Sequence, residues 1–495
     1  MRLGRLSAFA AALAVAACAP GRTFAPASGP VQEWRPTRHT TLPVGDAADE
    51  EFRSTPPPPL ASVRRKIAPP TETRLPNGAR LVLLERHDFP SVSAVLLLGR
   101  GAADASPGVA LTYAHALTGD SDEYKAGEAW QYLRFVGGRV EARATYDAVT
   151  LQTTALSPLF VSALSRSAPM FATPELGSDD VERARTTITA QRAGASDEPS
   201  VRAAERLTSL LFAGHPYGVP VDGGAAARGQ DGPIEKAVRP FRDANLTASE
   251  VTVVCVGDFK SEAMPRVITK ALGKLPTTAA QPRVPLATPQ PSDGARVVVI
   301  DRPGAVQSNV AIGWPGPRAA DDEATALEVL ADATAGDLST RLNLQVRKEL
   351  GATYGVHMHV HTFRAAGYVS ITAAIDTGRT ADALAGLFKE LERLRREPLS
   401  DEELSAAKRR AYYDLEEGTS RGLASVLAQT IGLGLPTTHL MTHNARVDAV
   451  TADAIRDAAA KRLTSDGARM VVTGDAAKIA DGLRSLGLGA VTVEK

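Results

Sequence analysis

Three histidines at alternating positions have a spacing that could make a metal site. If residues 357–361 form a strand, then His357, His359 and His361 share one face and their imidazoles could converge on an ion. Successive residues on one face of a strand are about 6.5–7 Å apart, which is wide for a single ion. No acidic partner lies nearby in the sequence. We therefore expect a polar sheet face here rather than a metal centre.

The two cysteines are too few for a disulfide framework, and they point to different roles. Cys255 lies in an apolar run and is expected to be a buried small hydrophobe. Cys18 ends a basic and then apolar leader that closes on Val-Ala-Ala-Cys, and this leader is too short to span a bilayer permanently. It resembles the lipobox of bacterial lipoproteins, in which the cysteine is diacylated. An ordinary signal peptide with an incidental cysteine is the alternative.

That resemblance implies a location in the bacterial cell envelope. Residues 1–18 would be a lipoprotein signal peptide, and lipid on Cys18 would anchor the chain to a membrane. Ala19 follows the cysteine, which by resemblance to Gram-negative sorting rules favours the outer membrane, facing the periplasm. Residues 19–70 are rich in proline and polar residues without sustained periodicity, so we expect a disordered tether.

The composition limits the kind of protein that residues after the tether can form. The chain carries 56 Lys+Arg and 56 Asp+Glu residues, so it has no net charge and no general attraction to nucleic acid. A length of 495 residues allows two domains of roughly 200 residues each. A hydrophobic content of 44% is typical of a folded, soluble protein.

The body contains one pattern twice. Apolar strands are predicted at the opening of each copy, at 79–84 and 295–300, and strands that end in Gly-Asp close each copy after almost the same number of residues, at 254–258 and 471–475. Helical stretches lie between them, and Ser178 and Ser400 are predicted to cap two of these, the second with Glu403 as a capping box. The pattern predicts two homologous α+β units.

The predicted boundaries follow from this repeat. The first unit is expected at 71–275 and the second at 294–495. The stretch 276–293 contains five prolines and is expected to be the hinge or linker between them.

Several stretches, in order along residues 70–495, resemble the insulinase/pitrilysin family of zinc metallopeptidases, which includes mitochondrial processing peptidase and bacterial two-unit members. They are Leu-Pro-Asn-Gly-Ala-Arg at 75–80, Gly-Gly-Arg at 137–139 with Asp147, Gly-His-Pro-Tyr-Gly-Val-Pro-Val at 214–221, Asp-Arg-Pro-Gly at 301–304, and 338–342 running into 347–355. The resemblance implies the clamshell fold of LuxS and the processing peptidases, in which two α+β units enclose a peptide chamber.

The family's catalytic motif is degenerate in this sequence. The family holds zinc with His-x-x-Glu-His on a helix and a glutamate about 76 residues later, and the first glutamate polarises the metal-bound water. The corresponding positions here are Leu111, Ala114, His115 and Gln191. Leucine and alanine are not ligands, glutamine is a poor one, and no carboxylate remains to act as a base. We expect no catalytic residue, no bound metal and no cofactor, and zinc only in a partner subunit.

One pair of functional residues is retained. Family members carry an arginine and a tyrosine seven residues apart in the second unit, and these side chains reach toward the bound peptide and the tetrahedral intermediate. Arg347 and Tyr354 stand in the matching context. They are predicted to bind substrate, an arginine by donating to a carbonyl or carboxylate and a tyrosine by donating to an oxyanion. The alternative is a surface helix charge and a packed strand residue.

Two classes of function follow from the resemblance. The chain is either a non-catalytic subunit that pairs with an active zinc peptidase of the same family, or a stand-alone peptide-binding or structural lipoprotein without a hydrolase role. The first class implies a heterodimer, with a self-dimer as the other arrangement, and an unstructured peptide as the ligand.

Overall fold

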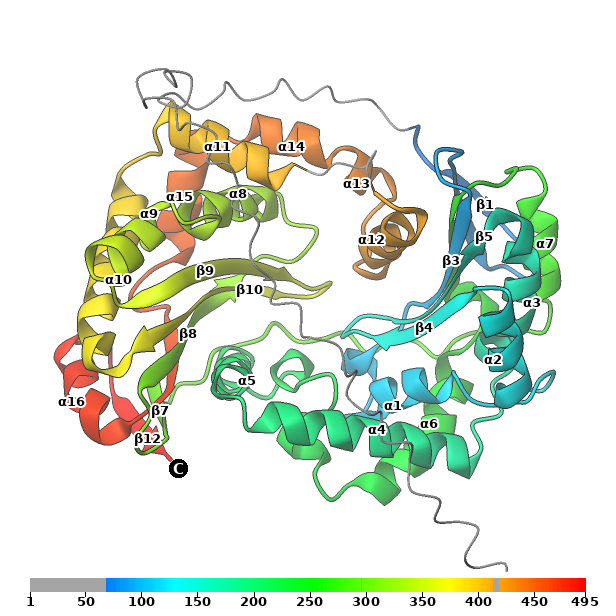
Figure 1. Cartoon of the computed structure of the whole chain (residues 1–495), viewed down its shortest axis with the longest axis horizontal. Helices are drawn as coiled ribbons and strands as arrows, with labels where there is room; N and C mark the ends of the chain where they lie inside the picture. The colour runs from blue at the N-terminus through cyan, green and yellow to red at the C-terminus, as the bar shows by residue number, and fades with distance from the viewer. Residues whose placement is uncertain (1–67, 295, 413–417) are drawn as a thin grey trace, which may run out of the picture. The chain divides into compact units, whose positions relative to one another are not determined.

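Two six-stranded sheets, each flanked by helices, organise the chain (Figure 1). This computed structural model describes residues 68–294, 296–412 and 418–495. The predicted leader, Cys18 and nearly all of the predicted tether therefore lie outside the described residues. Within the described ranges, no helix is long and apolar enough to cross a membrane.

The first repeat contains the first sheet and seven α-helices. Its strands are β1 (Thr71–Arg74), β2 (Arg80–Glu85), β3 (Ser91–Leu98), β4 (Arg139–Ala144), β5 (Val149–Leu156) and β6 (Val251–Gly257). Its helices are α1 (Val109–Ala116), α2 (Ala126–Phe135), α3 (Ser157–Ala172), α4 (Ser178–Ser196), α5 (Pro199–Leu211), α6 (Asp231–Asn245) and α7 (Met264–Ala271). Residues 276–293, the predicted linker, contain neither helix nor strand.

The second repeat contains the second sheet and the remaining α-helices of the described residues. Its strands are β7 (Val297–Asp301), β8 (Gln307–Gly316), β9 (Thr353–Thr362), β10 (Gly367–Asp376), β11 (Arg469–Gly474) and β12 (Val491–Glu494). Its helices are α8 (Glu323–Ala335), α9 (Arg341–Asn343), α10 (Thr380–Arg396), α11 (Asp401–Ala411), α12 (Ser420–Gly432), α13 (Thr438–Met441), α14 (His443–Ala449), α15 (Ala452–Arg462) and α16 (Ala476–Ser485).

Strand order confirms the predicted α+β duplication. The first sheet runs β1-β2-β6-β3-β5-β4 and the second runs β12-β7-β11-β8-β10-β9. In each sheet the strand that opens the repeat pairs in parallel with the strand that closes it, β2 with β6 and β7 with β11. In each sheet an antiparallel pair ends the sheet on the other side, β4 with β5 and β9 with β10. The two sheets differ in their outermost strands, because β1 is antiparallel to its neighbour β2 whereas β12 is parallel to its neighbour β7.

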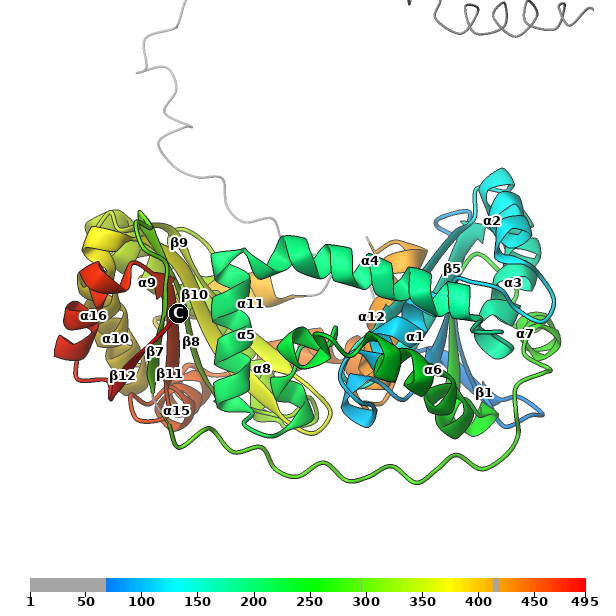
Figure 2. The same cartoon turned by 90° about the horizontal axis from the view of Figure 1, so that it is seen from below.

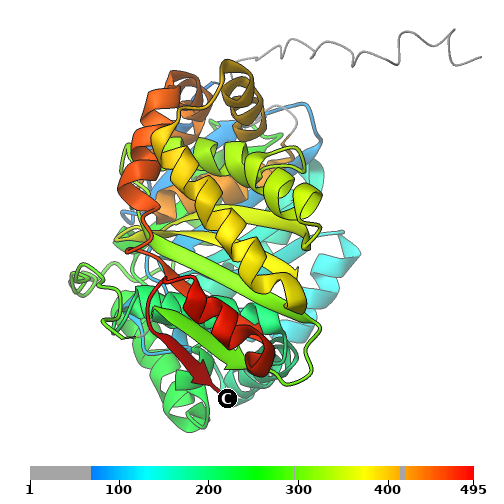
Figure 3. The same ribbon diagram turned by 90° about the vertical axis from the view of Figure 1, so that its left-hand side faces the viewer.

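Each sheet is covered on one face by helices of its own repeat and on the other by a helix of the other repeat. Helix α12 packs on β3 and β6 of the first sheet, and α5 packs on β8 and β11 of the second (Figures 1 and 2). Figure 3 shows α10 and α16 across the opposite face of the second sheet. Since both faces are covered, the central strands are mostly apolar. Every residue of β6 is buried, including Cys255, as predicted.

The exchanged helices contribute leucines and alanines to the covered faces. On the first sheet these pack against β2, β3 and β6, and on the second against β7, β8 and β11. The main contributors are Leu423, Leu427, Ala428 and Ile431 of α12, and Ala203, Leu207, Leu210 and Leu211 of α5. The described residues accordingly belong to one compact unit, although the sequence divides into two repeats.

One of the two predicted helix caps is confirmed. The Ser400 hydroxyl accepts from the Glu403 backbone N–H, and the Glu403 carboxylate accepts from the Ser400 N–H, which makes the predicted capping box of α11. The prediction for Ser178 was wrong, because Ser178 is the first residue of α4. The N-cap is Gly177, which has no side chain to donate or accept.

A buried polar network joins the β9–β10 hairpin of the second repeat to the first repeat. The Tyr217 hydroxyl donates to Asp147 Oδ1 at 2.8 Å and accepts from the Ala365 N–H at 3.2 Å. Asp147 Oδ2 accepts from the Arg364 N–H at 3.1 Å. Burial raises the pKa of Asp147 above its ordinary value. Tyr217 belongs to the Gly-His-Pro-Tyr-Gly motif, so this motif has a structural role between the repeats.

Replacing Tyr217 with phenylalanine should lower stability, because the Asp147 carboxylate and the Ala365 N–H would lose a buried partner. The expected loss is about 1–3 kcal/mol in the free energy of unfolding, measured by urea denaturation. Tyr354→Phe is the matched control, since that hydroxyl is exposed, and it should change stability by less than about 0.5 kcal/mol. Equal effects of the two substitutions would contradict the role given to Tyr217.

Candidate functional site

The four residues of the predicted degenerate metal site lie on two helices that pack together. Leu111, Ala114 and His115 are on α1, and Gln191 is on α4. Ala114 is fully buried, whereas Gln191 is exposed to solvent. His115 is half-buried, and burial lowers the pKa of its imidazole.

These residues do not fit a zinc ion. A zinc site in a protein takes three or four ligand side chains with nitrogen, sulfur or carboxylate oxygen donors. His115 is the one such side chain among the four. Across the described ranges, no three His, Cys, Asp or Glu side chains are grouped so that they could hold a metal ion. That the four positions correspond to the family motif stays a prediction.

Helix α1 contributes instead to the core of the first repeat. The Tyr113 ring is buried and meets Phe241 edge-on, with 5.4 Å between ring centroids. Burial raises the pKa of the Tyr113 hydroxyl, which has no hydrogen-bond partner among the described residues. The Thr112 hydroxyl donates to the Gly108 carbonyl within the helix. The helix is therefore built mainly for packing, as its apolar sequence requires.

An arginine network that the sequence analysis missed lies beside Gln191. Arg192 Nη2 donates to Glu205 Oε2 at 2.7 Å, and its Nη1 donates to Asp222 Oδ2 at 3.0 Å. The hydrogen bond with Glu205 is the main reason that the pKa of Arg192 is raised. These bonds join α4, α5 and the segment that contacts Gly108 at the start of α1. Arg192 thus fixes α4, which carries Gln191, to α5 and to the segment beside the start of α1.

Arg347 and Tyr354 lie in the second repeat, on either side of a short turn. Arg347 is half-buried in the π-helical segment η6 (Leu344–Glu349), and Tyr354 is the second residue of β9, with 86% of its surface exposed. Within the described part of the chain, neither side chain has a hydrogen bond or an ion pair. Tyr354 is therefore not a packed strand residue, and both donors are available to a ligand.

A cavity of about 390 Å³ lies beside Tyr354. Its walls come from β8, β9, β10 and the end of α8, and Ser200 of α5 adds a wall from the first repeat. Asn343 fixes the strand that presents Tyr354, because its Nδ2 donates to the Val356 carbonyl at 3.1 Å and its Oδ1 accepts from the Val356 N–H at 2.8 Å. Tyr354 thus stands at the rim of a preformed cavity between elements of both repeats.

The three histidines occupy one face of β9, as the alternation predicts. Ring centroids are 6.4 Å apart for His357 and His359, and 6.0 Å apart for His359 and His361. His361 stacks on Tyr368 at 4.1 Å, and its Nε2 lies 3.0 Å from the Ser370 hydroxyl. Burial lowers the pKa of His361 to about 4. The row is a polar sheet face with stacked rings, and the described residues include no group of three metal-binding side chains here that could hold an ion.

Two family models match successive parts of the chain. The model described as Insulinase (Peptidase family M16) matches residues 82–223, and the model described as Peptidase M16 inactive domain matches residues 235–411. The chain therefore belongs to the M16, or insulinase, family of peptidases. The predicted family and its two-repeat α+β fold are confirmed.

Relatives and solved structures agree with this membership. Proteins named uncharacterized zinc protease from Mycobacterium tuberculosis and Streptomyces coelicolor are both 25% identical to the chain, over 68% and 71% of its length and 78% and 76% of theirs. The M16 inactive domain protein from Pseudomonas fluorescens has a TM-score of 0.74 at 21% identity, covering 82% of this chain and 98% of that one.

A chain of complex III2 from Candida albicans shares the fold as well. Its TM-score is 0.70 at 16% identity, and the alignment covers 84% of this chain and 99% of that one. At this level of identity the likeness concerns the fold.

Replacing Arg192 with methionine should destabilise the first repeat, because Glu205 and Asp222 would remain as partly buried, unpaired carboxylates. Their side chains are about a quarter exposed, so solvent screening reduces the expected loss to about 1–3 kcal/mol. Thermal and urea denaturation measure it. The control is Arg202→Met, because Arg202 lies on α5 as Glu205 does but has no ion pair in the described residues. This substitution should change stability by less than about 0.5 kcal/mol. Equal losses would show that the network carries little stability.

Proposed function

We propose that this chain is a non-catalytic M16 subunit that pairs with a zinc-bearing relative and contributes to peptide binding and proteolysis. One observation carries the proposal. Arg347 and Tyr354 keep unpartnered, accessible side chains, whereas Leu111 and Ala114 stand where the resemblance expects a zinc ligand and a base. A chain that offers substrate-binding donors but no metal ligands suits a shared site.

The two retained side chains supply donors of different kinds. A guanidinium presents N–H groups in a fixed plane and can bind a peptide carbonyl or a terminal carboxylate at two points. A phenol can donate a single hydrogen bond to an oxygen that gains negative charge during hydrolysis. The partner would supply zinc and the base that activates water. This chain would bind and orient the peptide.

An assembly with a relative is supported by two kinds of likeness. A solved structure of the same fold is a chain of an assembly, complex III2. Relatives of moderate identity are named as zinc proteases, so the family includes members to which metal chemistry is assigned. A heterodimer with such a member is the arrangement that we propose, and a self-dimer is the alternative arrangement.

The same proposal places the subunit in the bacterial cell envelope, held by lipid on Cys18 and facing the periplasm. Replacing Cys18 with serine should release the protein from the membrane fraction or leave the leader uncleaved, because serine has no thiol to acylate. Fractionation and the mass of the mature N-terminus measure both results. Unchanged membrane association of the Cys18→Ser variant would reject the anchor.

Removing the two donors should slow proteolysis by the complex without preventing its assembly. Arg347→Ala and Tyr354→Phe are each expected to reduce kcat/KM of the reconstituted complex by about a hundredfold to a thousandfold, or roughly 2.7–4 kcal/mol, because each removes a preorganised donor to the transition state. Steady-state cleavage of an unstructured peptide measures the loss, and sedimentation measures assembly.

Lys348→Ala is the control for charge near the site, since Lys348 is an exposed neighbour of Arg347. It should leave turnover within about twofold of the wild type. Full activity in a complex that carries both Arg347→Ala and Tyr354→Phe would reject the role and favour a binding-only lipoprotein.

A further inference from the structure

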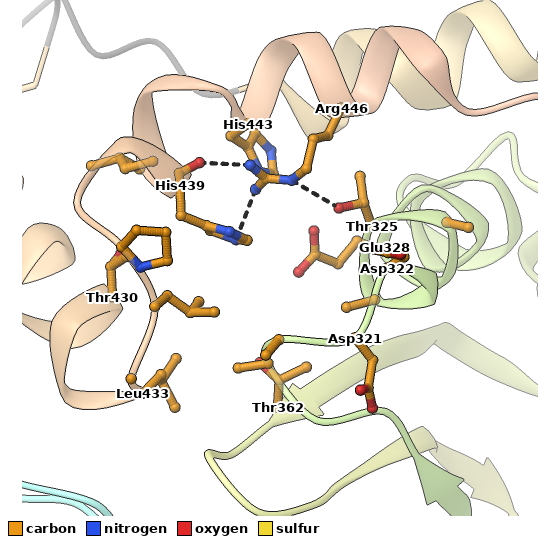
Figure 4. Close-up of a pocket in the computed structure, with 18 of the residues that line it drawn as sticks. Asp321, Asp322, Thr325, Glu328, Thr362, Thr430, Leu433, His439, His443 and Arg446 are labelled. Carbon is orange, nitrogen blue, oxygen red and sulfur yellow. Dashed lines mark hydrogen bonds between the residues drawn. The ribbon is translucent and has the colours of Figure 1, made fainter. Parts of the chain in front are cut away.

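A second and larger cavity lies between α8 and the segment α12–α14. Its volume is about 680 Å³, and it shares no lining residue with the cavity beside Tyr354. Much of its wall is apolar, and the aliphatic lining includes Val426, Leu433, Leu435, Leu440 and Val450. A few polar side chains converge within it, among them Glu328, His439 and Arg446 (Figure 4). Apolar walls with convergent polar groups are a feature of small-ligand sites.

The Arg446 guanidinium in this cavity already donates hydrogen bonds to the protein. Arg446 Nη1 donates to the His439 carbonyl at 2.7 Å and to the Thr442 hydroxyl at 2.8 Å. Its Nη2 donates to His439 Nε2 at 2.8 Å, and its Nε donates weakly to the Thr325 hydroxyl at 3.4 Å. His439 Nε2 must therefore be an acceptor. Burial lowers the pKa of His439 to about 4, in agreement with a neutral ring.

The Glu328 carboxylate, by contrast, has no hydrogen-bond donor within the described part of the protein. Its side chain extends from α8 into the cavity, below Arg446 and across from the His439 ring (Figure 4). Among the described residues it has no hydrogen bond and no ion pair, and Arg446 acts on it only through longer-range attraction. Burial raises the pKa of Glu328. An ionised carboxylate only accepts hydrogen bonds, so a half-buried one such as Glu328 is stabilised when a ligand brings a donor.

The other charged groups at the cavity do not supply that donor. Asp321 is paired with Arg318, whose Nη2 lies 2.8 Å from Asp321 Oδ1. Asp322 is exposed and adds negative charge among the lining residues. His443 Nε2 lies 2.8 Å from the Ala411 carbonyl and donates to it. Two lining carboxylates, those of Asp322 and Glu328, therefore lack a cationic donor among the described residues, and of these Asp322 is exposed whereas Glu328 is half-buried.

We propose that this cavity binds a primary ammonium group on an aliphatic stem, with Glu328 as the carboxylate that receives it. An ammonium group offers three N–H donors and a compact positive charge, which complete the acceptor positions of Glu328. The stem would cover Leu433 and Leu440, since an alkyl chain of four or five carbons gains from leaving water. A lysine side chain and a free alkylamine share this chemistry.

The test uses n-pentylamine and the uncharged 1-pentanol as probes of the purified full chain, with calorimetry as the readout. Pentylamine should bind about tenfold or more tightly than pentanol, because a hydrogen bond to an ionised group is stronger than one to a neutral group. Glu328→Gln should weaken pentylamine by about tenfold or more and leave pentanol nearly unchanged. Glu182→Gln, which removes an exposed carboxylate of α4, is the matched control and should bind both probes as the wild type does.

A second probe separates the two sources of the ammonium group. Binding of the tripeptide acetyl-Ala-Lys-Ala-amide, lost in Glu328→Gln, would assign the site to lysine side chains. Glu328-dependent binding of pentylamine, with no binding of the tripeptide, would assign the site to free amines. If Glu328→Gln does not fold, Ala320→Trp, at an exposed lining residue, should block pentylamine instead. Absence of saturable binding by both amines, or equal pentylamine affinity in the wild type and the folded variant, would overturn the proposal.

Discussion

The structure depends on the exchange of one helix between the two repeats. Each sheet has an apolar face that its own repeat leaves uncovered, and α12 or α5 of the other repeat covers it. Burying a leucine of this kind contributes roughly 1.5–3 kcal/mol, so a sheet without its exchanged helix would lose several such contributions at once. The described residues consequently form one unit, and neither repeat covers both faces of its sheet alone.

This constraint also fixes the places where ligands could bind. Because α5 packs against β8 and β11, Ser200 at its start forms a wall of the cavity beside Tyr354. Because α12 packs on the first sheet, the segment that follows it is held opposite α8, and these elements enclose the cavity that contains Glu328. Both cavities therefore require the two repeats to be folded together. The network of Asp147 and Tyr217 secures the β9–β10 hairpin in the same way.

Much of the architecture could be predicted from the sequence, because strand periodicity and the recurrence of Gly-Asp at 257–258 and 474–475 mark the ends of both repeats. The exchange of α5 and α12 could not. Periodicity shows that a helix has an apolar face, but it does not show which sheet that face meets. Ser178 was misassigned for a related reason, since the hydroxyl that could cap a helix and the first residue of the helix differ by one position.

The site was predicted unevenly. The positions of Leu111, Ala114 and His115 on one helix followed from a motif, whereas the network of Arg192 had no signal beyond a charge next to Gln191. The accessibility of Tyr354 could not be read from the strand sequence, because the same strand also contains the buried Val356 and Met358. Glu328 had no signal in the sequence, and only the packing of α13 and α14 beside α8 makes it a half-buried carboxylate at a cavity.

We propose that this chain supplies peptide contacts and no metal chemistry. Zinc content and peptide cleavage, measured side by side on the isolated chain and on its complex with an M16 zinc peptidase, test this proposal most directly. We expect no stoichiometric zinc and no cleavage for the isolated chain, with one zinc per heterodimer and cleavage by the complex. One zinc per isolated chain, lost together with hydrolysis in His115→Ala, would contradict it.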